Sequence, residues 1–154
     1  MRLQVSTRLA IFAVLELTAG EGRQLSVAEI GERYGVSSHH LAKVMHVLGR
    51  AGLVRSIRGA GGGYQFVGNA RRTTLLDVAQ LFEDLSSAEQ GTGSGDATHE
   101  EQTLSGILNE VDEIARATLG SITIATMRKL VERRAVGNVQ YSKASSRERS
   151  SPRL

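Results

Sequence analysis

Spaced apolar residues predict a first helix over about residues 6–20 and then two short helices separated by a tight turn. Ser26 and Glu29 stand three residues apart as a capping box, which opens the first short helix. Gly35 suits the left-handed conformation of a turn, and Ser37 or Ser38 caps a second helix that runs to about residue 51. Two short helices joined in this way form a helix-turn-helix.

The second short helix presents a basic, hydrogen-bonding face away from its apolar stripe. Such side chains suit phosphates and base edges in a DNA major groove. They are Ser38, His39, Lys43, His46 and Arg50. Any two capped helices produce a similar pattern, so the segment that follows decides its meaning.

That segment predicts a β-hairpin. Residues 53–58 and 64–67 alternate apolar and polar positions around a glycine-rich loop, which makes the wing of a winged helix. Arg55 and Arg58 flank its tip, where they could reach phosphates or a narrow minor groove. The glycines form neither a P-loop, since no Gly-Lys-Ser/Thr follows, nor a dinucleotide fingerprint, since a strand follows them. A plain hairpin loop is the alternative.

Helical patterns return after the hairpin. Thr73 or Thr74 begins a helix with Asp77 in a capping position, and a polar, glycine-rich loop follows over residues 86–99. A long helix then continues to about residue 119. Its apolar seam recurs at three- and four-residue spacing, and its members are Leu104, Ile107, Leu108, Val111, Ile114, Ala115 and Thr118. The economical partner for this seam is a second copy of the chain, and folding back on the winged domain is the alternative. A short helix capped by Thr123 follows, and we expect disorder beyond Ala135.

Composition excludes several classes of protein. The 154 residues are 40% apolar and include no cysteine. Disulfide scaffolds, thiolate zinc sites, cysteine-ligated iron–sulfur clusters and thiol catalysis are therefore excluded. The start of the chain is too polar for a secretory signal and no apolar run could span a membrane, so we expect a cytoplasmic protein.

Charge is unevenly distributed. Residues 23–72 have eight Lys/Arg against two acids, residues 86–115 have seven acids and no Lys/Arg, and residues 116–154 have nine Lys/Arg against two acids. A basic block beside an acidic one is expected where one face meets a polyanion. Chance clustering on a solvated surface is the alternative.

Four stretches carry a family resemblance: MRL at residues 1–3, GVS at 35–37, RAGLV at 50–54 and RGAGGGY at 58–64. They resemble the Rrf2 family of bacterial transcription regulators, which includes IscR, NsrR, RirA and CymR, and the similarity extends over about residues 1–134. The recognition-helix sequence at residues 37–44 is most similar to the NsrR-like branch.

The resemblance implies a dimeric winged-helix protein that binds palindromic promoter sites and represses. Together with the basic helix and hairpin, it gives a set of candidate DNA-binding residues: Ser37, Ser38, His39, His40, Lys43, Arg50, Arg55, Arg58 and Tyr64. We expect Arg71 and Arg72 to be further phosphate anchors.

The sequence departs from the family at the sensor. In many members three cysteines in the loop before the dimerisation helix hold an iron–sulfur cluster, and some add an acidic ligand at the position of Arg8. Here the loop has no thiolate and Arg8 is a cation, so we expect no cofactor. A divalent metal could bind through Asp96, His99, Glu100 and Glu101. The favoured interpretation is that these residues belong to a solvated loop and to the acidic first turn of the following helix. His39, His40 and His46 lack the spacing of a metal site.

The expected fold is mainly α with a small β-hairpin wing. A winged helix-turn-helix domain spans residues 1–85, a flexible loop 86–99, a dimerisation helix and a short following helix 100–134, and a basic tail 135–154. No catalytic constellation stands out, so we expect no enzyme. The expected function is a DNA-binding transcriptional repressor that acts as a homodimer on double-stranded DNA, with an unknown small-molecule or protein effector. The alternative is a winged-helix protein-interaction module that does not bind DNA.

Overall fold

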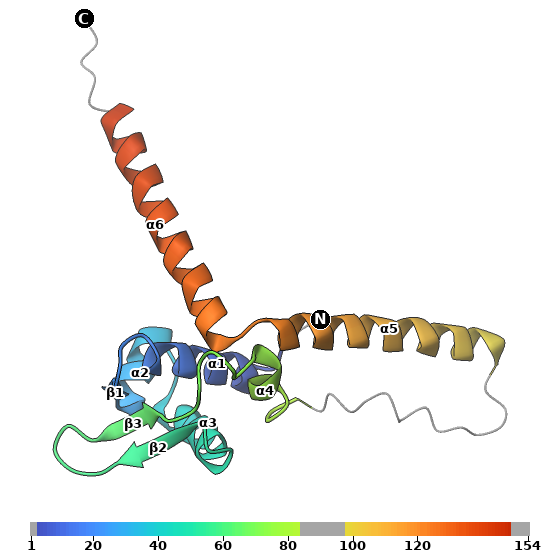
Figure 1. The fold of residues 1–154 in the computed structure, drawn as a ribbon, viewed down its shortest axis with the longest axis horizontal. Coiled ribbons are helices and arrows are strands. Elements are labelled where there is room, and N and C mark those ends of the chain that lie inside the picture. The colour runs from blue at the N-terminus through green and yellow to red at the C-terminus, as the bar shows by residue number, and fades with distance from the viewer. Residues whose placement is uncertain (1–2, 84–97, 149–154) are drawn as a thin grey trace, which may run out of the picture.

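A computed structural model of the chain describes residues 3–83 and 98–148, with side chains as far as Val136. The fold is mostly helical with one small antiparallel sheet, which confirms the expected fold class (Figure 1). In chain order the elements are α1 (Val5–Leu17), β1 (Gln24–Leu25), α2 (Val27–Tyr34), α3 (Ser38–Arg50), β2 (Val54–Ile57), β3 (Gly63–Phe66), α4 (Leu75–Ala79), α5 (His99–Ser121) and α6 (Ile124–Glu148). Within the described residues, no helix is long and apolar enough to cross a membrane.

Helix α1 lies at the centre of the winged domain. Apolar residues occupy more than one of its faces because α3, α4, α6 and β3 all contact it. The predicted inner face of α3 packs against it, with Leu41, Val44, Met45 and Leu48 each at most 2% exposed. This shared core fixes the orientation of α3 and therefore which of its side chains face the solvent.

The turn between α2 and α3 is close-packed. The predicted capping box at Ser26 is present, since the Ser26 hydroxyl accepts from the Glu29 amide at 3.2 Å and the Glu29 carboxylate accepts from the Ser26 amide at 2.7 Å. Gly35 has φ +64°, and the Val36 amide donates to the Gly31 carbonyl at 2.9 Å. A Cβ added at Gly31 would lie 2.7 Å from the Val36 oxygen, so this approach requires glycine.

The sheet has three strands in the order β1-β3-β2, one more than the hairpin that the sequence predicts. Strands β2 and β3 form the predicted wing, in which Arg55 pairs with Gln65. The added strand, β1, pairs Leu25 with Tyr64 along the other edge of β3. Two residues are too few to show an alternating pattern, which is why the sequence did not reveal β1.

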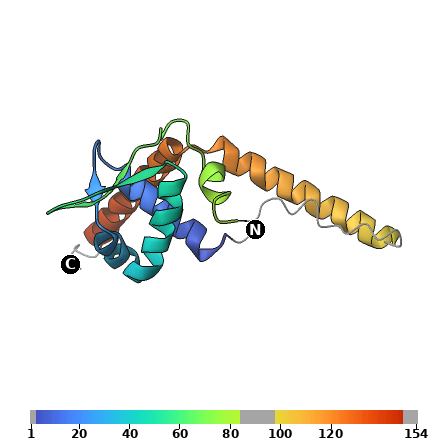
Figure 2. The ribbon, with the colours of Figure 1, turned by 90° about the horizontal axis from the view of Figure 1, so that it is seen from below.

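Helices α5 and α6 leave the winged domain in different directions (Figures 1 and 2). The short helix expected after Thr123 is instead 25 residues long, and the disorder expected beyond Ala135 is wrong as far as Glu148. The reason is that residues 124–148 contain many good helix formers and no proline, so a polar segment can remain helical. The expected tail after residue 148 lies outside the described residues.

The junction between α5 and α6 belongs to the core of the winged domain. Ile124 is fully buried, and its amide donates to the Thr73 carbonyl at 2.9 Å. The Leu75 amide in turn donates to the Ile122 carbonyl at 2.9 Å. The two long helices are therefore anchored to the domain at their shared end.

Candidate nucleic-acid interface

Helix α3 and the wing, formed by β2, β3 and the turn over residues 58–62, lie on the same side of the winged domain. Figure 1 places both at the side away from α6, and Figure 2, seen from below, shows α3 in front with the wing extending beside it. The chain from residue 36 to 66, which forms α3 and the wing, has four Lys/Arg and no Asp or Glu. A surface of one sign with no internal counter-charge suits a polyanion.

The first turn of α3 is ordered by its own cap. Ser37 is the N-cap, and its hydroxyl accepts from the His40 amide at 3.3 Å. Ser38, His39 and Lys43 are exposed on the outer face of the helix. His40 is half-buried instead, with its Nε2 atom 3.5 Å from the Ser6 hydroxyl of α1. His40 therefore faces α1 at least as much as the solvent.

The cations of this surface are available to a ligand. Lys43, Arg50 and Arg58 are exposed and make no ion pair or side-chain hydrogen bond with any residue that the structure describes. Arg71 and Arg72 are exposed in the segment between the sheet and α4.

Arg55 is held in place across the sheet. Its Nε and Nη2 atoms donate to the Gln65 Oε1 atom at 3.2 and 2.9 Å. The sequence analysis did not identify Gln65 as a partner of Arg55. Pairing the two strands of the hairpin about the glycine-rich loop would have placed these two residues opposite each other. Tyr64 is half-buried and packs against the hydrophobic core, so its ring supports the wing from within.

A polar cluster fixes α2 against α1. Glu16, which is 9% exposed, accepts the Tyr34 hydroxyl at 2.8 Å and pairs with the Nε atom of Arg33 at 3.1 Å. Burial and this hydrogen bond to Glu16 raise the pKa of Tyr34 to about 12. The Tyr34 ring also stacks on Phe12 with centroids 5.0 Å apart. The helix that precedes the turn into α3 is thereby fixed in position.

A comparison with known families agrees with this arrangement. The profile of the Rrf2 family, described as an iron-dependent transcriptional regulator, matches residues 3–129. The chain belongs to the Rrf2 family. It is a DNA-binding transcriptional regulator and not an enzyme.

Individual relatives support the same conclusion. BadM of Rhodopseudomonas palustris, named as an HTH-type transcriptional regulator, is 47% identical over 133 residues, which cover 86% of this chain and 84% of BadM. The structure of IscR from T. potens superposes with a TM-score of 0.70 at 29% identity, covering 86% of this chain and 90% of IscR. CymR of B. subtilis, described as the global cysteine regulator, shares the fold, with a TM-score of 0.68 at 24% identity over 84% of this chain and 98% of CymR. Placement in the NsrR-like branch of the Rrf2 family stays a prediction.

The residues of this Rrf2 protein do not fit a thiolate-ligated cluster. The chain has no cysteine, and Arg8 is exposed with its guanidinium 6.0 Å above the Phe12 ring. Asp96 lies outside the described residues. Glu101 is engaged in a capping box with Thr98 at the start of α5. No group of three His, Asp or Glu that could hold a metal occurs within residues 3–83 and 98–136.

The predicted seam of α5 is uncovered in the single chain. No residue of α5 is buried, and the five large apolar side chains of the seam are 53–60% exposed: Leu104, Ile107, Leu108, Val111 and Ile114. Ala115 is half-buried, and the Thr118 hydroxyl donates to the Ile114 carbonyl at 2.8 Å. The seam therefore does not fold back on the winged domain, because only the end of α5 near Leu119 packs against the core.

Proposed function

We propose that the protein is a dimeric repressor that binds a palindromic promoter site through α3 and the wing, and that it works without an iron–sulfur cluster. The observation that carries this proposal is the exposed set of cations on α3 and the wing, where no acidic residue between residues 36 and 66 offsets them. Since promoters lie in the cytoplasm of bacteria, we propose that the protein acts there.

The contacts divide by geometry. The N-terminal part of α3 offers Ser38, His39 and Lys43 to base edges in the major groove, with Ser37 and His40 beside them. We assign Arg58, at the wing tip, to the adjacent minor groove. Arg50, Arg55, Arg71 and Arg72 serve as phosphate anchors. Tyr64 contributes by supporting the wing, since its ring packs against the core.

The proposal of a palindromic DNA site rests on dimerisation. The uncovered seam of α5 fits a second copy of the chain, and a two-fold dimer presents two α3 helices to two half-sites. Without cysteine, any signal that changes DNA affinity must use chemistry other than a thiolate-bound cluster.

Two substitutions test the DNA interface. Lys43→Ala and Arg58→Ala should each weaken operator binding by about tenfold or more, because each removes a contact worth roughly 1–3 kcal/mol. Lys129→Ala, which removes an exposed cation from α6, is the matched control and should leave the affinity unchanged. Fluorescence anisotropy at fixed salt measures all three. Unchanged affinity in both test variants, with intact circular dichroism, would show that this surface does not bind DNA.

The protein-interaction module remains the second candidate, because the exposed seam of α5 could receive another protein. A salt titration with random duplex DNA separates the two. A DNA-binding protein releases counterions and gives a steep negative slope of log affinity against log salt, and a protein-interaction module gives none.

A further inference from the structure

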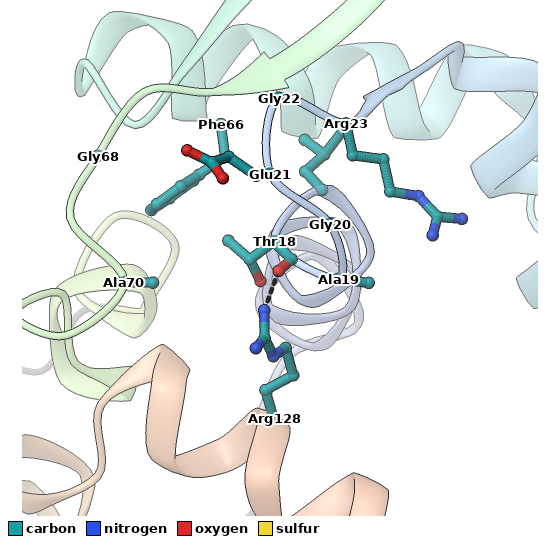
Figure 3. A pocket seen from close by; sticks show the side chains of 11 residues that line it. Thr18, Ala19, Gly20, Glu21, Gly22, Arg23, Phe66, Gly68, Ala70 and Arg128 are labelled. Carbon is teal, nitrogen blue, oxygen red and sulfur yellow. Dashed lines mark hydrogen bonds between the residues drawn. The ribbon is translucent and has the colours of Figure 1, made fainter.

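A cavity of about 490 Å³ opens on the winged domain, away from both α3 and the α5 seam. One wall is the segment that leaves the wing, with Phe66, Gly68 and Ala70, and the other is the end of α1 and the turn after it, residues 17–23. Arg128, from the first turns of α6, points into the space between them (Figure 3). The volume lies within the usual range of small-molecule sites.

Most of the lining is apolar or backbone. Leu17, Phe66 and Ala70 contribute hydrocarbon, and several of the other positions are glycines that add no side chain. Polar and apolar atoms contribute about equally to the exposed lining, so the cavity suits a compact molecule that has both an apolar body and a polar end.

Arg128 is the polar group that gives the cavity an orientation. Its Nη1 atom donates to the Thr18 carbonyl, which fixes the guanidinium at the end of α1. Its Nε atom lies 3.3 Å from a Glu132 carboxylate oxygen but is buried and makes no hydrogen bond within the described part of the chain. A guanidinium has five N–H donors in a planar fork that matches a carboxylate. Donors on Nη1 and Nη2 therefore remain for a ligand.

The other charged side chains of the lining limit what can bind. Arg23 also lines the cavity, but its side chain is directed away from the space between the walls and toward Glu16, with their charged atoms 3.8 Å apart, whereas the guanidinium of Arg128 lies between the walls (Figure 3). Glu21 also lines the cavity, and Figure 3 shows it at the end away from Arg128. A second carboxylate at that end would be repelled by Glu21.

We propose that this cavity binds a small organic monocarboxylate, with its carboxylate on Arg128 and its apolar body between Phe66 and Ala70. Glu21 disfavours dicarboxylates of the same length. The walls belong to the exit of the wing, α1 and α6, so an occupant contacts both the DNA-binding domain and the base of the long helices. The binding itself does not depend on the proposed repressor function.

The first test uses three probes of one length on the full chain: hexanoate, hexanamide and adipate. Isothermal titration and the thermal shift of the protein should both show that hexanoate binds, and that it binds at least about tenfold tighter than the other two, because an amide lacks the charge for Arg128 and adipate meets Glu21. No binding of hexanoate at millimolar concentration, or equal binding of hexanoate and hexanamide, would overturn the proposal.

Variants then place the site. Arg128→Met should weaken hexanoate binding at least about tenfold and leave the weak binding of hexanamide unchanged. Ala70→Leu fills the cavity without touching Arg128, so it should abolish binding of both probes even if Arg128→Met fails to fold. Lys129→Met removes a neighbouring cation outside the cavity and is the matched control. Hexanoate binding that survives Ala70→Leu in folded protein would place the carboxylate elsewhere, such as the α5 seam, and would refute the assignment.

Discussion

Replacing Val111 by Asp is expected to convert a dimer into monomers without unfolding the chain. Val111 lies in the middle of the α5 seam, and 53% of its surface is exposed in the single chain. Nothing within the described residues covers the seam, so the substitution should leave the winged domain unaffected.

The expected loss of dimerisation free energy follows from the apolar surface of Val111 that a partner copy would bury. Fully burying a large apolar side chain is worth about 1.5–3 kcal/mol, so the exposed half of Val111 is worth roughly 1 kcal/mol per protomer. Placing an unpaired carboxylate in the same contact adds a desolvation penalty of several kcal/mol per ion. Since a two-fold interface contains the change twice, the two burial losses and the two carboxylate penalties together come to about 6 kcal/mol or more. That loss raises the dimer dissociation constant by at least about ten-thousandfold.

The assay is sedimentation velocity over a range of protein concentrations. Asn109→Asp is the matched control, because it creates the same residue in the same helix on the side away from the seam and should leave the dissociation constant unchanged. If Val111→Asp stays dimeric with a dissociation constant like that of Asn109→Asp, the seam of α5 is not the dimer interface.

Three further predictions concern the scaffold. Gly31→Ala should destabilise the protein by about 1–3 kcal/mol in urea unfolding, because the new Cβ would lie 2.7 Å from a backbone oxygen, and Gly49→Ala, whose nearest neighbour is 3.8 Å away, should be neutral or slightly stabilising. The pKa of Tyr34 is raised to about 12 in the folded state, so its neutral hydroxyl contributes to the free energy of unfolding below pH 10, and this contribution is lost as the pH rises through 12. Tyr34→Phe should remove this part of the pH dependence in the same unfolding assay. In the folded protein the buried Thr7 hydroxyl donates to the Glu83 carboxylate at 2.5 Å. Glu83→Ala leaves this hydroxyl without its acceptor and should lower the free energy of unfolding by about 2 kcal/mol in thermal unfolding. An unchanged melting temperature would show that this hydrogen bond does not stabilise the protein.

Local chemistry in the sequence predicted the starts of α2, α4 and α6, but not that of α1, which has no side-chain cap. The capping pairs of Ser26 with Glu29 and of Thr74 with Asp77 both form as expected. Thr123 also caps α6, since its hydroxyl accepts from the Thr126 amide at 3.1 Å. Caps and turns are set within three or four residues, so their pattern is visible in a single chain.

Contacts between distant residues could not be predicted in this way. Glu83 accepts from the Gln4 amide at 2.6 Å across 79 residues, and Arg128 reaches Thr18 across 110. Neither pair has a local pattern, because each depends on the packing of helices far apart in the sequence. The same holds for the candidate cavity, whose lining comes from three separate segments. The length of α6 was missed for another reason, since its polar composition resembles that of a disordered tail.

These distant contacts all converge on α1. Its start has no side-chain cap of its own, and the Gln4 amide at that end donates to Glu83 instead. Its last turn carries Glu16, which holds α2, and its end receives Arg128 from α6. Because α3 packs against this same helix, a force applied to α5 by a partner copy reaches it through α4, and a ligand in the cavity contacts its end directly. The scaffold thus offers a route from dimerisation or ligand binding to DNA recognition that requires no metal cluster.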